Sequence, residues 1–152
     1  MLIPLAGLLA LLAPDATAPA DICELGRVIV HDLPPAVPVP VDVGYYVDGS
    51  SSRSGLLALC PNLREKLPAG YSIADYSAWA RANIHAPLPG RPTAPAIIYT
   101  VGVPKLAANA RSATVDMTVT CTGLCGQGLV AYYIRTSDGW RRDGQPHTKW
   151  VS

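Results

Sequence analysis

The sequence predicts an α+β domain in which N-terminal helices pack on an antiparallel β-meander of about four to five strands. Apolar residues recur at helical spacing over residues 22–33, whereas apolar and polar residues alternate over 112–122. An Asp-Gly pair at 138–139 is typical of a hairpin turn. With 49% hydrophobic residues in 152, the chain can bury the core of one domain, which we place at 21–152.

The charge balance excludes one class of partner. Only 15% of residues are charged and the formal net charge is +1, so no basic field is available for phosphates and we expect no nucleic-acid partner. Gly123, Gly126 and Gly128 follow neither the P-loop nor the dinucleotide-binding spacing, and they are better explained as turn residues. We therefore predict no cofactor.

The N-terminal segment indicates export. Residues 2–13 form an apolar run of the length of a signal-peptide core, too short to cross about 30 Å of hydrocarbon as a helix. Small residues allow a cut after Ala18 or after Ala20, and the second is preferred because the first places Pro19 directly after the cut. We expect a signal peptide at 1–20, a periplasmic or secreted domain and no membrane span after cleavage, with an uncleaved anchor or a buried helix as the alternatives.

Four cysteines agree with an oxidising compartment, because two disulfides are common in small exported domains. Three pairings are open. Cys121 and Cys125 lie four residues apart in a glycine-containing loop, which favours a bridge between them, and Cys23 and Cys60 then pair by elimination.

The first half of the mature chain is expected to be mainly helical. Residues 22–33 form an amphipathic helix with Asp21 as its N-cap, and a short helix begins near Cys60. The alternating segment 37–47 contains two prolines, which restrict it to an edge strand or an extended lead-in.

A second helix is expected at 72–84, with Ser72 as N-cap and Asp75 in the capping position. Four prolines then exclude regular structure over 85–95. The β half follows, with strands expected at 96–102, 112–122, 129–136 and around Trp150. Trp79 and the face of Val115, Met117 and Val119 should lie in the core.

The C-terminal third carries one resemblance. The segments 121–128 (CTGLCGQG), 138–140 (DGW) and 150–152 (WVS) resemble a pattern in uncharacterised bacterial exported proteins, roughly CGxLCGxG, then DGxW or DGW, then WxS. Thr122 departs from that pattern, which has glycine there. The resemblance implies an exported α+β domain and no assigned reaction.

The cysteine pair also raises a chemical hypothesis, because two neighbouring thiols can exchange with a substrate disulfide. In thioredoxin-type enzymes the pair is spaced Cys-x-x-Cys and lies at a helix N-terminus, which lowers the thiol pKa. Here the spacing is one residue longer and both flanks are predicted strands, so a structural bridge is favoured. A zinc site would need two more ligands, such as His147 with His85 or Cys60, and no second paired motif is present.

Catalytic residues are not predicted. Three histidines and the serine cluster at 50–54 lack the motifs that accompany hydrolase or metalloprotease chemistry. A candidate binding surface is formed by aromatic and arginine side chains of the last strands, for which ordinary cross-strand packing is the competing explanation. Its members are Tyr132, Tyr133, Arg135, Trp140 and Arg141.

The sequence thus predicts an exported small domain with a non-catalytic structural or binding role in the bacterial envelope, its partner an envelope protein or a small ligand. Two alternatives stay open. One is a thiol-disulfide or other cysteine-dependent enzyme that uses Cys121 and Cys125. The other is an adaptor that docks an envelope protein through its aromatic strands.

Overall fold

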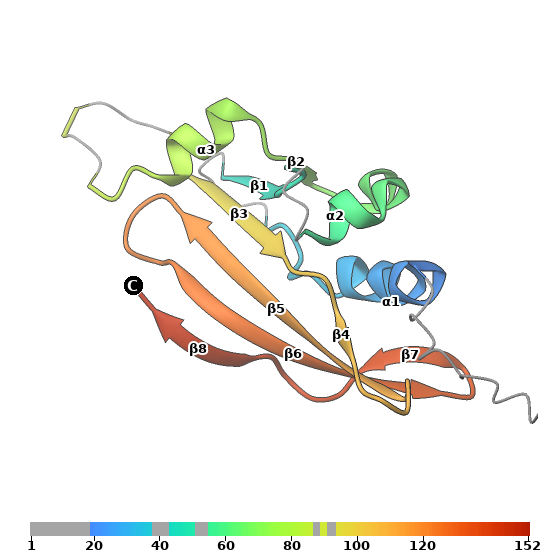
Figure 1. Cartoon of the computed structure of the whole chain (residues 1–152). Coiled ribbons are helices and arrows are strands. Elements are labelled where there is room, and N and C mark those ends of the chain that lie inside the picture. The colour runs from blue at the N-terminus through green and yellow to red at the C-terminus, as the bar shows by residue number, and fades with distance from the viewer. Residues whose placement is uncertain (1–18, 38–42, 51–54, 87–88, 91–93) are drawn as a thin grey trace, which may run out of the picture.

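The computed structural model describes residues 19–37, 43–50, 55–86, 89–90 and 94–152. One sheet and a set of short helices make up this part of the chain (Figure 1). In chain order the elements are α1 (Pro19–His31), β1 (Gly44–Val47), α2 (Leu56–Leu59), the 3-10 helix η1 (Pro61–Lys66), β2 (Tyr71–Ile73), α3 (Tyr76–Ala82), β3 (Ala96–Val101), β4 (Lys105–Leu106), β5 (Ser112–Cys121), β6 (Gln127–Thr136), β7 (Gly139–Arg142) and β8 (His147–Val151).

The chain is an α+β protein, as the sequence predicts, but its sheet is larger and mixed. The strand order is β2-β1-β3-β5-β6-β7, with β4 paired to β5 and β8 paired to β6. β1 runs parallel to both β2 and β3, whereas every pair from β3 onward is antiparallel. The prediction of a purely antiparallel meander of four to five strands is therefore wrong.

The difference arises in the first half of the chain. Parallel neighbours need crossover connections, and here α2 with η1 joins β1 to β2, while α3 joins β2 to β3. The predicted edge strand is reduced to β1, which lies between two partners inside the sheet and begins only at Gly44. Its prolines at 38 and 40 lie outside the described residues.

Helix α1 occupies most of the predicted segment, but it begins three residues earlier, at Pro19, and ends at His31. Leu25, Ile29 and Val30 are fully buried, which is the apolar stripe that the helical spacing marks. Asp21 therefore lies in the first turn of the helix instead of capping it.

Helix α3 is shorter than predicted. It begins at Tyr76, and its N-cap is Asp75, whose carboxylate accepts the Ala78 N–H at 2.7 Å. Residues 71–73, which the sequence pattern assigns in part to this helix, form strand β2. A segment of three residues is too short to distinguish helical spacing from strand alternation. For this reason the sequence pattern did not predict β2 as a strand.

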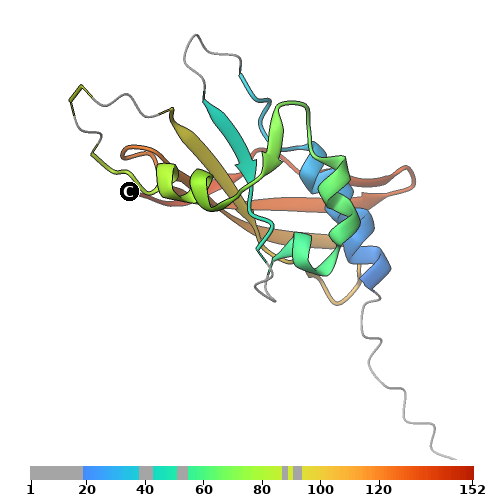
Figure 2. The ribbon, with the colours of Figure 1, turned by 90° about the horizontal axis from the view of Figure 1, so that it is seen from above.

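The helices cover both faces of the sheet, as the two views show (Figures 1 and 2). α1, α2 and η1 bury the main core with the inner face of β5 and β6, where Val115, Met117 and Val119 are buried as predicted. On the opposite, outer face, Ala78 and Ala82 of α3 pack against Ile98 of β3. Trp79 is partly buried and packs against this second cluster.

The β5–β6 hairpin is the regular part of the fold. Each strand has ten residues, and the burial of β5 alternates without interruption. A two-residue turn then joins β6 to β7, with Gly139 at φ +108°, where a side chain would be strained. The predicted hairpin is present, but its two turn residues are Ser137 and Asp138, because Gly139 is the first residue of β7 and pairs with Thr136.

Replacing Val119 by Asp should destabilise the fold by several kcal/mol, because the carboxylate would lie unpaired in the main core, where Val119 is only 5% exposed. Urea unfolding followed by circular dichroism measures the loss. Thr114→Asp is the matched control, since Thr114 lies on the same strand with its side chain on the outer face, opposite Lys105. A Val119→Asp protein as stable as this control would contradict the placement of the core.

Candidate functional site

The four cysteines form two disulfides, in the pairing that the spacing favours. The Cys23–Cys60 disulfide links α1 to the residue that follows α2. Its two Cα atoms are 5.6 Å apart, and the two cysteines are separated by 37 positions in the sequence. Cys121–Cys125 closes the turn between β5 and β6, with Cα atoms 5.9 Å apart. No cysteine of the chain is free.

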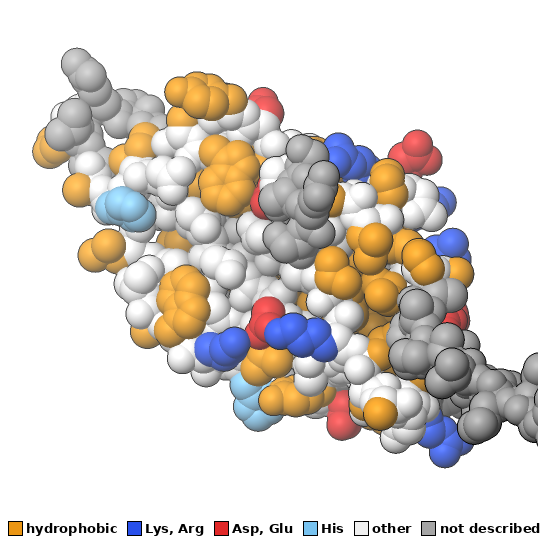
Figure 3. Space-filling view, in the orientation of Figure 1, with side chains coloured by type: hydrophobic (Ala, Val, Ile, Leu, Met, Phe, Trp, Pro, Cys, Tyr) orange, Lys and Arg blue, Asp and Glu red, His pale blue; other side chains and the backbone are white. Residues whose placement is uncertain are grey.

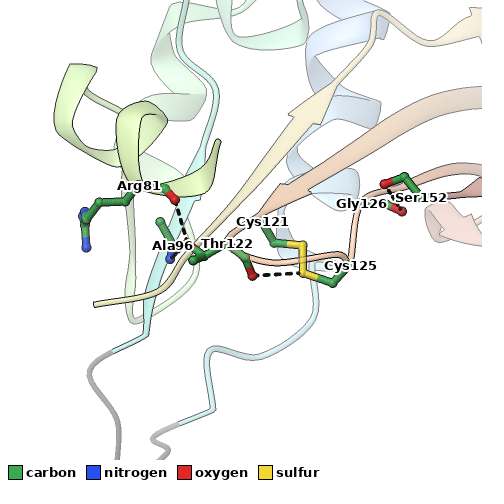
Figure 4. The surroundings of a disulfide bond; sticks show 7 residues. All are labelled: Arg81, Ala96, Cys121, Thr122, Cys125, Gly126 and Ser152. Atoms are coloured by element: carbon green, nitrogen blue, oxygen red, sulfur yellow. Dashed lines mark hydrogen bonds between the residues drawn. A yellow bond between two sulfur atoms is a disulfide. The ribbon is translucent and has the colours of Figure 1, made fainter. Parts of the chain in front are cut away.

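The turn closed by Cys121 and Cys125 connects several distant segments (Figure 4). The Thr122 hydroxyl donates to the Arg81 carbonyl at 2.8 Å and accepts the Ala96 N–H at 2.9 Å, which joins α3 to β3. The Gly126 carbonyl accepts the Ser152 N–H at 2.9 Å. Thr122, the departure from the resembling pattern, is thus the residue whose hydroxyl bridges the two elements.

The two cysteines of this pair differ in solvent exposure. Cys121 is the last residue of β5 and is buried, whereas Cys125 is exposed. Both flanks of the pair are strands, β5 and β6, so the pair has no helix N-terminus of the kind that lowers a thiol pKa in thioredoxin-type enzymes. The turn is thus held by the disulfide together with the hydrogen bonds of Thr122 and Gly126.

The predicted aromatic and arginine surface is divided between the two faces of the sheet. Tyr133 and Trp140 are buried on the helix-covered face, and the Arg135 guanidinium lies 5.6 Å from the centre of the Trp140 ring. Tyr132 and Arg141 are exposed, and strand alternation directs them to the outer face. Arg135 also approaches Glu24 of α1 at 3.6 Å. The structure does not bring these five residues together as one surface.

The outer face of β5, β6 and β8 carries a group of exposed side chains (Figure 3). Asp116 lies between Lys105 and Lys149, with an N–O distance of 3.0 Å to each. Hydrogen bonds from Lys149 and Lys105 hold the pKa of the Asp116 carboxyl below its usual range. The Tyr132 and His147 rings meet edge to face at 5.6 Å.

A bulge shapes the same region. Gly128 pairs with Trp150 and Leu129 with Thr148, which leaves Lys149 as one extra residue in β8. The Trp150 indole lies directly over Gly128, where any Cβ would collide with it. Because of the bulge, Lys149 and Trp150 both lie on the outer face, although they are adjacent in the strand. The Trp150 side chain is 48% exposed.

A cavity of about 420 Å³ lies on the helix-covered face, where α1 ends. Its volume falls in the range of about 300–1,000 Å³ that is usual for ligand sites. Ile29 and Leu33 supply apolar surface from the helix side, and Met117 and Leu129 supply it from β5 and β6. The cavity therefore has a predominantly apolar body enclosed between the end of the helix and the sheet.

The segment after α1 is held over the cavity by a buried phenol. The Tyr71 hydroxyl donates to the Pro34 carbonyl at 2.7 Å, and the Tyr71 ring packs against Tyr99 at 6.0 Å between ring centres. Burial, followed by the neighbouring phenols, raises the pKa of Tyr71, and burial likewise raises the pKa of Tyr99. Both hydroxyls therefore stay protonated at neutral pH. Tyr71 thus fixes one wall of the cavity.

Polar groups gather at one end of the cavity. Burial, followed by the charge of Asp32, raises the pKa of Tyr133, so the phenol lies close enough to that carboxylate to feel its charge. Arg142 donates to the Asp32 main-chain carbonyl at 3.3 Å, and His31 Nδ1 lies 3.7 Å from the Asp32 carboxylate. A carboxylate, a phenol and a guanidinium thus line the end of a mainly apolar space.

The sequence patterns did not indicate this cavity. They marked Tyr133 as part of a candidate binding surface, and His31 is one of three histidines that lack the motifs of hydrolase or metalloprotease chemistry. Asp32 lies at the end of the helix predicted over 22–33, and Arg142 follows the predicted hairpin turn, so neither position pointed to a cavity. The residues that line the cavity come from five separate segments, so no local pattern joins them.

Other kinds of site are not built by the described residues. Among them, no three His, Cys, Asp or Glu side chains are grouped closely enough to hold a metal ion. No helix in the described ranges has the length and apolar character needed to cross a membrane. Comparison with known protein families, with curated proteins and with solved structures gives no match for this chain.

Removing the two disulfides should have unequal effects. Loss of Cys23–Cys60 frees a loop of 37 residues and should cost about 4 kcal/mol, whereas loss of Cys121–Cys125 frees a loop of only 4 and should cost about 2 kcal/mol. Paired Cys→Ala variants, each lacking one bridge, are compared by urea unfolding. A larger loss for the short loop would show that the turn contributes more than chain entropy.

Proposed function

We propose that this chain is an exported, non-catalytic domain that binds a small amphipathic molecule in the cavity at the end of α1. The observation that carries the proposal is the composition of that cavity, an apolar body of about 420 Å³ with Asp32, Tyr133 and Arg142 at one end. Small-molecule sites combine apolar walls with a few convergent polar groups in this way. The apolar part provides affinity, and the polar end fixes the orientation of the ligand.

A binding role fits the cavity better than catalysis. The described residues that line it include no serine, cysteine or lysine, the usual side-chain nucleophiles. His31 is the only imidazole among these described lining residues, and its side chain is 90% exposed, so bound substrate would not be shielded from water at this base.

Export is part of the proposal. Disulfides and the lack of a membrane-spanning helix in the described part of the chain are consistent with a periplasmic or secreted protein. The signal-like segment at 1–20 and the resemblance of the C-terminal motif to bacterial exported proteins support the same location.

The mature protein should begin at Asp21. Intact mass of the exported chain, with alkylation before reduction, reports the cleavage site and the free thiols together. We expect the mass of residues 21–152 with no alkylated cysteine. A mass that retains residues 1–20 would contradict cleavage, and two alkylated thiols mapped to Cys121 and Cys125 would favour the cysteine-dependent enzyme instead.

The outer face supports a second candidate function, docking of an envelope protein. Trp150 and Tyr132 are large aromatic side chains on this face that remain 48% and 41% exposed. Exposed aromatic residues on a strand surface are typical anchors of protein interfaces. Loss of partner capture on replacing Trp150 by Ala, with ligand binding in the cavity unchanged, would distinguish this role from the first.

Filling the cavity should abolish binding of an uncharged apolar probe such as Nile red. Leu129→Trp places an indole inside the cavity and should weaken probe binding by about tenfold or more, which corresponds to about 1.4 kcal/mol. Fluorescence titration measures the affinity. Val130→Trp is the matched control, because the neighbouring side chain points to the outer face and should leave the affinity unchanged. Equal probe binding by both variants would contradict the proposed site.

A further inference from the structure

Resting on the proposed ligand-binding function, we infer that the cavity recognises a zwitterionic amino acid or dipeptide with an apolar side chain. Arg142 would hold the carboxylate of the ligand, Asp32 its ammonium, and the apolar body of the cavity its side chain. The inference depends on how the two charged groups are arranged at one end of the cavity.

Arg142 is available to an anion. Across the described residues, no carboxylate oxygen lies within 4.0 Å of its guanidinium, and its hydrogen bond goes to the main-chain carbonyl of Asp32 at 3.3 Å. A guanidinium has five N–H donors in a planar fork that matches a carboxylate. Most of these donors therefore remain for a ligand, in a half-buried position that lines the cavity.

Asp32 is available to a cation at the same end. Its side chain is 22% exposed, and the groups near it are the Tyr133 hydroxyl, whose pKa responds to the Asp32 charge, and the peripheral His31 ring at 3.7 Å. A carboxylate has about four acceptor positions, so these contacts do not saturate it. The Tyr133 hydroxyl, kept protonated by burial and by the charge of Asp32, adds an uncharged polar group at the same end of the cavity.

The two charges together select for a zwitterion. A purely anionic amphiphile would bring its carboxylate to Arg142 and meet repulsion from Asp32, and a purely cationic one would meet repulsion from Arg142. An α-amino acid or a short peptide satisfies both groups at once. Ile29, Leu33, Met117 and Leu129 then enclose an apolar side chain and would leave the polar atoms of a hydrophilic one unpaired.

Isothermal titration with matched ligands tests the charge requirement on the unaltered protein. The probes are L-leucine, L-phenylalanine and the dipeptide leucyl-leucine, together with 4-methylpentanoate, which lacks the amine of leucine, and 3-methylbutylamine, which lacks its carboxylate. We expect at least one zwitterion to bind and each truncated analogue of leucine to bind more weakly by about tenfold or more, because one charged hydrogen-bonding group is left unpaired. Equal binding of the truncated analogues would overturn the inference.

Substitutions assign the two charges. Arg142→Gln and Asp32→Asn should each weaken binding of the zwitterion by about tenfold or more, whereas Arg142→Lys, which keeps the charge but not the fork, should lose less. Arg141→Gln is the matched control, because Arg141 is exposed on the opposite face of the same strand. If Arg142→Gln leaves zwitterion binding unchanged, the assignment is wrong.

Nile red separates this inference from the proposed function. A protein that binds Nile red in the cavity, with Leu129→Trp blocking it, but binds none of the zwitterions would overturn the inference and leave the proposed binding function standing. A protein that binds neither kind of probe would overturn both. Binding of the zwitterions that is lost in Leu129→Trp and in Arg142→Gln, but kept in Arg141→Gln, is the result that we expect.

Discussion

Burial of one face of β5 and β6 beneath α1 is the contact on which the rest of the structure depends. Every second side chain of β5 points to this face. Leu25, Ile29 and Val30 of α1 cover it. A helix of 13 residues is only about 20 Å long, whereas a strand of 10 residues spans about 34 Å. The helix is therefore shorter than the strands that it covers, and the cavity lies where it ends.

Local patterns were sufficient to predict the elements that are long or chemically marked. The stripe of α1, the alternation of β5 and the turn before Gly139 each repeat a signal over many residues or require a specific residue type. The spacing of Cys121 and Cys125 likewise constrained the disulfide pairing, because a bridge between these two left only one pair. Thus the C-terminal hairpins and the first helix could be derived from sequence.

The parallel strands and the cavity could not be derived in this way. β1 and β2 have four and three residues, which is at most two periods of strand alternation, and nothing local indicates that a strand will pair in parallel. The residues of the predicted aromatic surface are divided between two faces of the sheet for a simpler reason. Tyr132 and Tyr133 are adjacent in one strand, so they point to opposite faces of the sheet. Asp32 and Arg142 meet only through tertiary contacts, 110 positions apart.

The bulge at Lys149 also has a consequence for the edge of the sheet. β8 is exposed along its whole length, and a regular, uncovered edge strand invites pairing with the edge of another molecule. The extra residue breaks the regular spacing of main-chain donors and acceptors, and local twist increases at such a point. A second copy of the chain would therefore find a poor template for continuing the sheet, which disfavours aggregation through this strand at high concentration.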